Sequence, residues 1–306
     1  MAEDEGVNGT IWNKEATKLL SLFGWKTIGD YDMDVLGEDD KKYGLDTLLN
    51  FFTPMKNNPQ SVILEAKRYN TESFSKSTLQ DWIDRLDKKI IELKNSEGFI
   101  STFPELKECS VLDMGIIAIW FHNIHDYQSF RPKFIEALEN VVTSNRIRKA
   151  GANRIFVIDN DIILKLCSLH SAIADYENEN KCNIEFYYPS ILTNDNPIIR
   201  NKTLTIEYIF SKIILAESKG SNPENIVFYF GELNTPSFKQ LKSLLTMCSF
   251  MDKEKPIKIF IYHTDETIFR KIKSDIDDLF EDVNITFKNM DNRIDLLPQL
   301  KDVIYE

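Results

Sequence analysis

Apolar and polar side chains alternate along residues 61–69, and this alternation predicts a β-strand. Val62 and Leu64 fall on one face of that strand, whereas Glu65 and Lys67 fall side by side on the other. A carboxylate and an amine on a strand with an apolar face are costly to bury unless they pair or bind a ligand. The candidate chemistry of the chain therefore centres on this strand.

Hydrophobic periodicity predicts the other elements of the first half. We expect helices at residues 11–23, 79–93, 132–144 and 161–175, and strands at residues 25–36, 45–52, 111–121 and 154–159. A loop with two prolines separates the strand at 45–52 from the strand at 61–69, so the two are expected to form an antiparallel hairpin. That pairing would bring Asp46 across from the Glu65 end of the second strand.

Strands and helices alternate regularly in the last third of the chain. We expect strands at residues 226–230, 257–262 and 284–288, and helices at residues 236–250, 266–280 and 294–302. Such spacing predicts a parallel α/β sheet. Residues 203–217 are ambiguous, because they begin like a strand and continue like a helix. No glycine-rich phosphate-binding motif follows any of these strands. The sequence therefore does not indicate that this part of the chain hydrolyses nucleotides or binds a dinucleotide cofactor.

Two α/β domains are expected, residues 1–178 and residues 179–306, because a polar stretch at 175–183 separates the two patterns. The first would hold a mixed sheet flanked by helices. The second would hold a mainly parallel sheet with a regulatory, DNA-positioning or partner-docking role.

Composition narrows the class of protein. The chain has 306 residues, of which 42% are hydrophobic and 28% are charged, as in ordinary globular proteins. A net charge of −11 argues against non-specific coating of nucleic acid, although it leaves room for a local basic groove. No apolar run is long enough for a membrane span, the start of the chain is acidic, and the four cysteines are widely spaced. We therefore expect a cytoplasmic protein without a membrane partner.

One short region is basic and contains no acid. It carries four cationic residues, Arg146, Arg148, Lys149 and Arg154. In an acidic protein such a region is a candidate for contacts with DNA phosphates. A charged helix end or loop explains the same pattern.

The order of polar residues along the first half resembles the PD-(D/E)XK nuclease superfamily. The residues occur as Glu15 on a helix, Asp46 at the start of a strand, Glu65-Ala-Lys67 on the next strand and Gln80 on the following helix. The longer run Glu-Ala-Lys-Arg-Tyr69 is most similar to the Mrr-like restriction-endonuclease branch. The resemblance covers about residues 11–160. It departs from the family pattern in having Leu45 before the aspartate and a long loop before the Glu65 strand.

This resemblance implies a restriction-endonuclease-like fold and a Mg²⁺ (or Mn²⁺) site. Asp46, Glu65 and the backbone carbonyl of Ala66 would supply the oxygen ligands that such ions prefer. Lys67 would orient or deprotonate the attacking water and counter the charge that develops on the phosphate. An ion pair between Glu65 and Lys67 on an exposed sheet is the alternative interpretation.

Two further residues acquire roles from the resemblance. Glu15 would contact a metal-bound water or a second metal, and Gln80 would hold the active-site frame or a phosphate. Each also has a structural interpretation: Glu15 as a solvated flank of its helix or a partner of Lys18, and Gln80 as the N3 residue of a capping box whose N-cap is Ser77.

The sequence thus predicts a metal-dependent DNA endonuclease. The chain is also similar to nuclease subunits of two-gene bacterial anti-phage defence systems carried near prophage attachment sites, which implies a second protein subunit or a homo-oligomer as partner. One alternative is a catalytically inactive nuclease-like module that binds nucleic acid or scaffolds a defence complex. An RNA nuclease is another, because the metal chemistry is the same.

Overall fold

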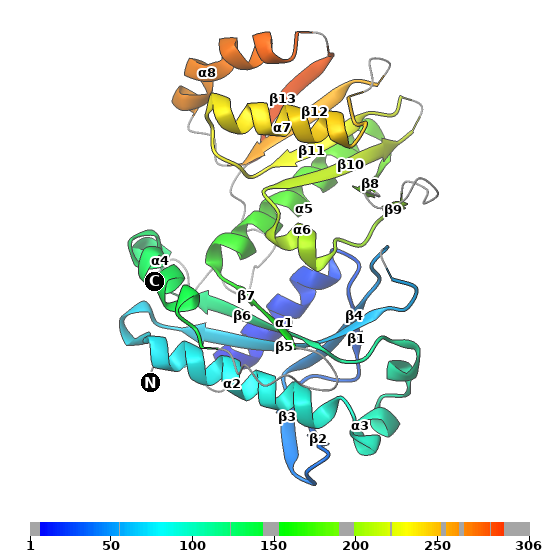
Figure 1. Ribbon diagram of the computed structural model, residues 1–306, viewed down its shortest axis with the longest axis vertical. Coiled ribbons are helices and arrows are strands. Elements are labelled where there is room, and N and C mark those ends of the chain that lie inside the picture. Colours follow the sequence, from blue (N-terminus) through cyan, green and yellow to red (C-terminus); the bar gives the residue numbers. More distant parts are fainter. Residues whose placement is uncertain are drawn as a thin grey trace. The chain divides into compact units, whose positions relative to one another are not determined.

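The computed structural model describes residues 7–54, 56–122, 124–142, 153–189, 199–220, 222–251, 255–262, 266–281 and 283–290. The described residues divide into two compact units, one up to Ile163 and one from Leu164 to Met290. Each unit is a β-sheet with helices packed on it, so the expected α/β class is confirmed (Figure 1). The domain boundary at residue 178 stays a prediction. Across the described residues, no helix combines the length and the apolar character needed to cross a bilayer.

The first unit is built on a five-stranded mixed sheet. Its elements are α1 (Val7–Ser21), β1 (Lys26–Ile28), β2 (Met33–Leu36), β3 (Lys42–Leu45), β4 (Thr47–Phe51), β5 (Gln60–Tyr69), α2 (Lys76–Leu93), α3 (Glu97–Thr102), β6 (Met114–Phe121), α4 (Ile124–Glu139), β7 (Arg154–Ile158) and the start of α5 (Asn160–Asn180). The strand order is β1-β4-β5-β6-β7, while β2 and β3 form a separate hairpin. The β5–β6 and β6–β7 pairs are parallel, and the others are antiparallel.

Helices α1 and α2 cover opposite faces of this sheet. Trp12 of α1 packs on Trp120 of β6, with ring centroids 5.8 Å apart. Trp82 of α2 belongs instead to the apolar cluster that contains Ile119, the neighbour of Trp120. Because successive side chains of a strand point to opposite faces, the two helices lie on opposite sides (Figure 1). Lys67 is in register with Ile119, so it lies on the α2 face, and so does Glu65.

The expected hairpin between β4 and β5 is confirmed, and its last register pair is Thr47 with Leu64. The strand expected at residues 111–121 is also confirmed as β6, which is buried throughout. Both predictions held because each strand is a long apolar run whose ends are marked by polar residues.

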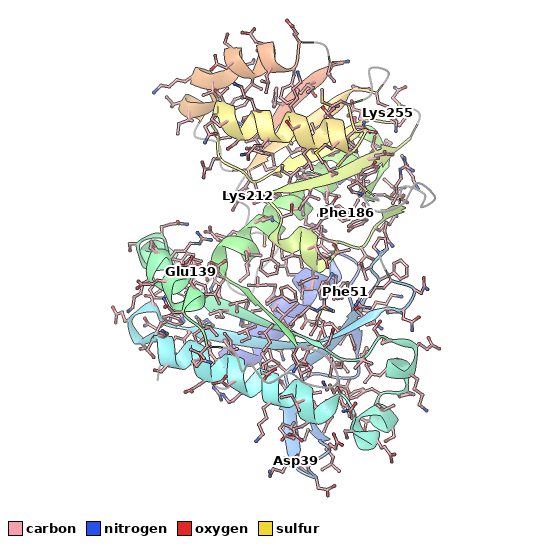
Figure 2. All side chains as sticks on the ribbon, viewed as in Figure 1. Asp39, Phe51, Glu139, Phe186, Lys212 and Lys255 are labelled. Atoms are coloured by element: carbon pink, nitrogen blue, oxygen red, sulfur yellow. The ribbon has the colours of Figure 1, made fainter. Side chains whose placement is uncertain are left out.

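The strand expected at residues 25–36 is broken in two, and the strand expected at 45–52 begins only at Thr47, because Leu45 ends β3. Positive φ angles at Gly29 (71°) and Asp32 (54°) turn the chain between β1 and β2. The boundary between β3 and β4 falls at Asp46, where the chain leaves the small β2–β3 hairpin and enters the main sheet as β4. Figure 2 shows Asp39 at the tip of this hairpin, where it accepts a hydrogen bond from Tyr43 (3.0 Å). One predicted strand therefore serves two sheets.

The predicted capping box at the start of α2 is wrong. The N-cap is Ser75, whose backbone is extended and whose hydroxyl accepts a hydrogen bond from a main-chain N–H of the first turn (3.2 Å). Ser77 lies inside the helix, and Gln80 is not its capping partner. The helix ends at Leu93, as predicted, and Gly98 belongs to α3.

Two helices are longer than predicted. Helix α4 begins at Ile124 because the buried Tyr127 extends its apolar side toward the N-terminus. Pro132, where the predicted helix began, lies inside α4. Helix α5 continues to Asn180 through most of the polar stretch, because Tyr176 is buried there and donates a hydrogen bond to Glu224 (2.6 Å).

The second unit contains a six-stranded sheet of order β13-β12-β11-β10-β8-β9. Its elements after α5 are β8 (Asn183–Tyr188), β9 (Ile199–Asn201), α6 (Ile206–Phe210), β10 (Ile213–Lys219), β11 (Asn225–Tyr229), α7 (Thr235–Met247), β12 (Ile257–Tyr262), α8 (Glu266–Leu279) and β13 (Ile285–Met290). The pairs β11–β12 and β12–β13 are parallel, as expected where α7 and α8 connect the strands, and the remaining pairs are antiparallel. The helix expected at 294–302 lies outside the described residues.

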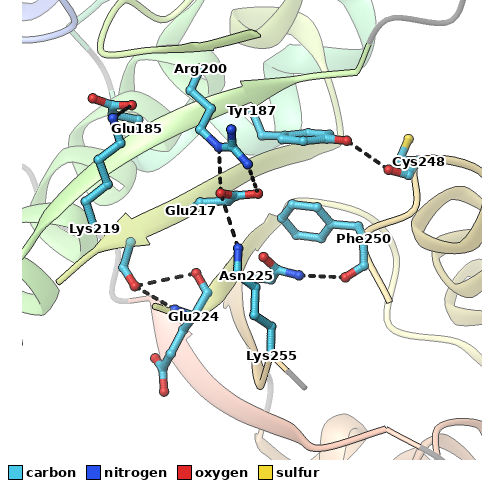
Figure 3. A network of polar contacts seen from close by, with 11 residues as sticks. Glu185, Tyr187, Arg200, Glu217, Lys219, Glu224, Asn225, Cys248, Phe250 and Lys255 are labelled. Carbon is cyan, nitrogen blue, oxygen red and sulfur yellow. Dashed lines mark hydrogen bonds and ion pairs between the residues drawn. The ribbon is translucent and has the colours of Figure 1, made fainter. Parts of the chain in front are cut away.

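Residues 203–217 fold in the reverse of the predicted order, with the short helix α6 first and strand β10 after it. The strand is fixed by its two neighbours, β8 and β11. Its one buried acid, Glu217, accepts two hydrogen bonds from Arg200 (2.6 and 3.1 Å) and lies 3.5 Å from Lys255, as Figure 3 shows. This ion-pair network makes a carboxylate tolerable on an otherwise apolar strand.

Candidate active site

Asp46 is bound to the main chain of β5. Its Oδ2 accepts a hydrogen bond from the N–H of Ala66 (2.8 Å). The regular pairing of β4 with β5 ends at Leu64. The backbone of β4 therefore does not pair with the Ala66 N–H, and the Asp46 side chain accepts its hydrogen bond instead. The carbonyl of a strand residue leaves on the same side as its N–H. The Ala66 carbonyl and the Asp46 carboxylate therefore lie at the same edge of β5.

Glu65 is held between two lysines. Its Oε2 lies 3.6 Å from the ammonium of Lys67, and its Oε1 accepts a hydrogen bond from Lys89 of α2. Lys89 also donates to the carbonyl of Gly44 in β3. The three charged side chains are between 12% and 15% exposed, so they are mostly shielded from water but still reachable. Sequence reasoning missed Lys89, although its position seven residues after Trp82 places it on the apolar face of the helix.

The carboxylates of Asp46 and Glu65 lie close together in a mostly buried site. Burial raises the pKa of Asp46 to about 6, with a further contribution from the neighbouring charge of Glu65. The pKa of Asp46 is lowered in part by the charge of Lys67, by the hydrogen bond from the Ala66 N–H and by the charge of Lys89. Two carboxylates that repel each other are stabilised by a cation between them.

The donor atoms fit a hard divalent cation. Among the described residues, no three His, Cys, Asp or Glu side chains gather as a metal-binding group. The site offers two carboxylates and one carbonyl, which suits an ion that keeps several waters, as Mg²⁺ does. The closeness of the two carboxylates favours this assignment, because burial and the nearby charge of Glu65 raise the pKa of Asp46 and a bound cation would offset both effects.

Glu15 lies on the other side of the sheet. It is 3% exposed, and its carboxylate lies 3.9 Å from Lys18, the partner considered from sequence. Burial raises its pKa, and Lys18 lowers it by a smaller amount. Among the described residues, the contact found for the Glu15 carboxylate is with Lys18, and none joins it to Glu65 or Lys67. Its role at a metal stays a prediction.

Helix α1 reaches the site through Asn13, which sequence reasoning also missed. The buried Asn13 amide donates to the backbone carbonyl of Asp46 (2.9 Å) and to the Asp32 carboxylate (3.1 Å), and its oxygen accepts from Thr47 (2.8 Å). These bonds fix the backbone at the point where the chain changes sheets. The sequence feature that could have indicated Asn13 is an amide side chain between apolar positions of a helix expected to be buried.

Gln80 does not join the group. Its amide forms two hydrogen bonds of 2.9 Å with the backbone of Val142 and one of 3.0 Å with Asp84. It precedes Lys89 by nine residues, roughly 14 Å along a helix axis. Gln80 therefore holds the chain after α4, and Lys89 is the residue of α2 that meets Glu65.

The proposed DNA-binding region is only partly described. Arg146, Arg148 and Lys149 lie outside the described residues. Arg154 begins β7, and its guanidinium lies 3.1 and 3.2 Å from the two carboxylate oxygens of Asp113. Its charge is therefore already paired with an acid that lies far away in the sequence.

A cavity of about 300 Å³ opens beside Glu65 and Lys67 on the α2 face. Its other lining residues are Tyr43, Trp82, Arg85, Lys88, Lys89 and Ile117. Arg85 and Lys88 are exposed, and among the described residues neither forms an ion pair. Four cationic side chains at one opening make the surroundings of Glu65 attractive to a phosphate.

Comparison with known proteins agrees with this geometry. Residues 1–162 match the family model described as GAPS4 protein PD-(D/E)XK nuclease domain. No curated protein and no solved structure matches the chain.

Proposed function

Because the chain belongs to the PD-(D/E)XK nuclease family of GAPS4, an anti-phage defence family, we propose that it is a metal-dependent DNA endonuclease controlled by a partner subunit. The observation that carries the proposal is the hydrogen bond from Ala66 to Asp46 next to the Glu65–Lys67 pair. It gathers two carboxylates, a carbonyl and an ammonium at one edge of β5.

Asp46, Glu65 and the Ala66 carbonyl would hold Mg²⁺ or Mn²⁺. When bound, the ion lowers the pKa of a water and neutralises charge on the phosphate. Lys67 faces the cavity and remains mostly shielded from water. Its ammonium holds a positive charge where negative charge develops on the phosphoryl oxygens, and it orients the attacking water by hydrogen bonding.

The exposed cations of α2 would bind the substrate. Arg85 and Lys88 lie on the wall of the cavity that contains Glu65 and Lys67. A DNA strand whose phosphates contact them would run past the catalytic group. The net charge of −11 repels DNA elsewhere, so binding depends on this local patch and on what a partner subunit adds.

The test uses purified protein with and without a partner subunit. Linear DNA, circular DNA and RNA are incubated with Mg²⁺, with Mn²⁺ or with EDTA. We expect internal cleavage of DNA that needs the divalent ion and is lost in Glu65→Gln. Cleavage in EDTA, or equal cleavage by Glu65→Gln, would overturn the proposal, and cleavage of RNA alone would correct its substrate.

A further inference from the structure

We propose that Lys89 is a positioning residue that fixes the Glu65 carboxylate relative to Asp46, so that both can bind one divalent cation. This inference rests on the proposed function. Lys89 donates hydrogen bonds to Glu65 Oε1 and to the carbonyl of Gly44. Gly44 belongs to β3 and precedes Asp46 by two residues, so one ammonium ties the strand that leads to Asp46 to the strand that carries Glu65.

The two lysines at Glu65 are placed for different tasks. Lys89 is within hydrogen-bond distance of Oε1, whereas the Lys67 ammonium lies 3.6 Å from Oε2, which is an ion pair beyond hydrogen-bond distance. Lys89 restrains the direction of the carboxylate through two acceptors on two strands. Lys67 contacts Glu65 more loosely and is therefore better placed to act toward the substrate.

The helix gives Lys89 a rigid base. Leu86, Ile90 and Leu93 are each at most 1% exposed and pin α2 to the sheet on both sides of Lys89. Further apolar residues of the helix are buried along its length. The fold of α2 therefore does not depend on Lys89, and substitutions there are expected to leave the first unit folded.

Groups that orient a metal ligand through hydrogen bonds tune metal affinity. Loss of such an outer partner weakens metal binding on the order of 10- to 100-fold. Replacement of Lys89 by Met keeps the length and the apolar stem and removes both hydrogen bonds. Replacement by Arg keeps the charge and the donors, so Lys89→Arg is expected to recover part of the affinity.

The experiment is calorimetric titration of the metal-free protein with Mn²⁺ for wild type, Lys89→Met, Lys89→Arg and Lys76→Met. Lys76 is an exposed lysine in the first turn of the same helix and does not line the cavity, so it is the matched control. We expect Lys89→Met to weaken Mn²⁺ binding about tenfold or more, Lys89→Arg to weaken it less, and Lys76→Met to leave it unchanged. In cleavage assays at fixed Mn²⁺, kcat should fall in Lys89→Met while KM for DNA stays the same.

The outcomes separate this inference from the proposed function. If wild-type protein binds no Mn²⁺, or if Glu65→Gln binds it equally well, the metal-dependent mechanism itself is wrong. If wild type binds Mn²⁺ through Glu65 and Lys89→Met binds it equally or more tightly, the mechanism stands and the positioning role of Lys89 is overturned. Thermal unfolding of each variant shows that the comparison is made between folded proteins, and Lys89→Gln replaces Lys89→Met if the latter does not fold.

Discussion

The carboxylate of Asp46 accepts a hydrogen bond of 2.8 Å from the backbone N–H of Ala66. This contact joins the residue where the chain changes sheets to the middle position of Glu65-Ala-Lys67. It also sets where one carboxylate lies relative to the other, because Ala66 and Glu65 are neighbours on a rigid strand.

Asp46→Asn should abolish cleavage without unfolding the protein. The amide oxygen can still accept the hydrogen bond from Ala66, whereas the charge needed for a divalent cation is lost. Asp46→Ala should abolish cleavage as well, and at about pH 4, where the cost of burying an ionised Asp46 is small, it should lower the free energy of unfolding by about 1 kcal/mol because it removes the hydrogen bond. Plasmid cleavage and urea denaturation measure the two effects. Cleavage by Asp46→Asn at the wild-type rate contradicts the assignment.

The metal-free protein should lose stability as pH rises from about 4 to about 6. The pKa of Asp46 is raised from 3.8 to about 6 in the folded state, so the folded protein binds the proton more tightly than the unfolded chain does. This contribution to stability is fully present below the unfolded pKa and disappears above the folded pKa, and its upper limit is about 3 kcal/mol.

The pH effect is measured by urea denaturation of wild type and Asp46→Asn in EDTA at several pH values. Burial also raises the pKa of Glu15, which acts in the same direction in both proteins. The difference between the two curves therefore isolates Asp46. A difference that does not change between pH 4 and pH 7 would show that Asp46 titrates normally.

Asn13→Ala should destabilise the first unit and slow cleavage. It removes the hydrogen bonds of Asn13 with the carbonyl of Asp46 and with the hydroxyl of Thr47, each worth about 1 kcal/mol, while Thr47 still bonds to the Asp46 carbonyl and to Thr17. The exposed neighbour Lys14 supplies the control, since Lys14→Ala should change neither property. Equal unfolding free energies for the two variants would remove Asn13 from the site.

Gln80→Ala should keep cleavage close to the wild-type rate. Its amide binds the backbone of Val142, so the loss should appear as a decrease of about 1 kcal/mol in the free energy of unfolding. Initial cleavage rates of wild type and Gln80→Ala at saturating Mg²⁺ measure whether kcat changes. A large fall in kcat with unchanged stability would restore the catalytic role that the resemblance gave to Gln80.

Reversing the charge of Arg85 or Lys88 should weaken DNA binding. Each residue that contacts a phosphate contributes roughly one unit to the slope of log affinity against log salt. Fluorescence anisotropy of labelled DNA at several salt concentrations should therefore show a smaller slope for Arg85→Glu and Lys88→Glu. Lys76→Glu, on the same helix but away from the cavity, is the control that should match wild type in slope.

Local sequence pattern predicted the parts of the site that lie on one strand. Glu65 and Lys67 share a face because alternation is a property of the strand itself, and Asp46 meets the same strand because a hairpin pairs neighbouring segments. Lys89 and Asn13 were missed for the opposite reason. Each reaches the site from a helix whose docking depends on the whole core, and nothing near Lys89 in sequence indicates that it points at Glu65.

The misassigned elements have similar causes. The strand at 45–52 is continuous by hydrophobicity, but Leu45 ends β3 and pairs with β2, whereas Thr47–Phe51 forms β4 and pairs with β5. Residues 203–217 carry both periodicities, and pairing with β8 and β11 decides which part becomes the strand. Such choices depend on tertiary contacts that a local pattern does not contain.

The most direct test of the central claim is cleavage of supercoiled plasmid by wild type and Glu65→Gln, each with Mg²⁺ and with EDTA. Glu65→Gln keeps the size of the side chain and removes the charge that binds the cation. Metal-dependent catalysis at β5 predicts nicked and linear products from wild type with Mg²⁺ only, and intact plasmid in the other three reactions. Equal cleavage by both proteins with Mg²⁺ would contradict it.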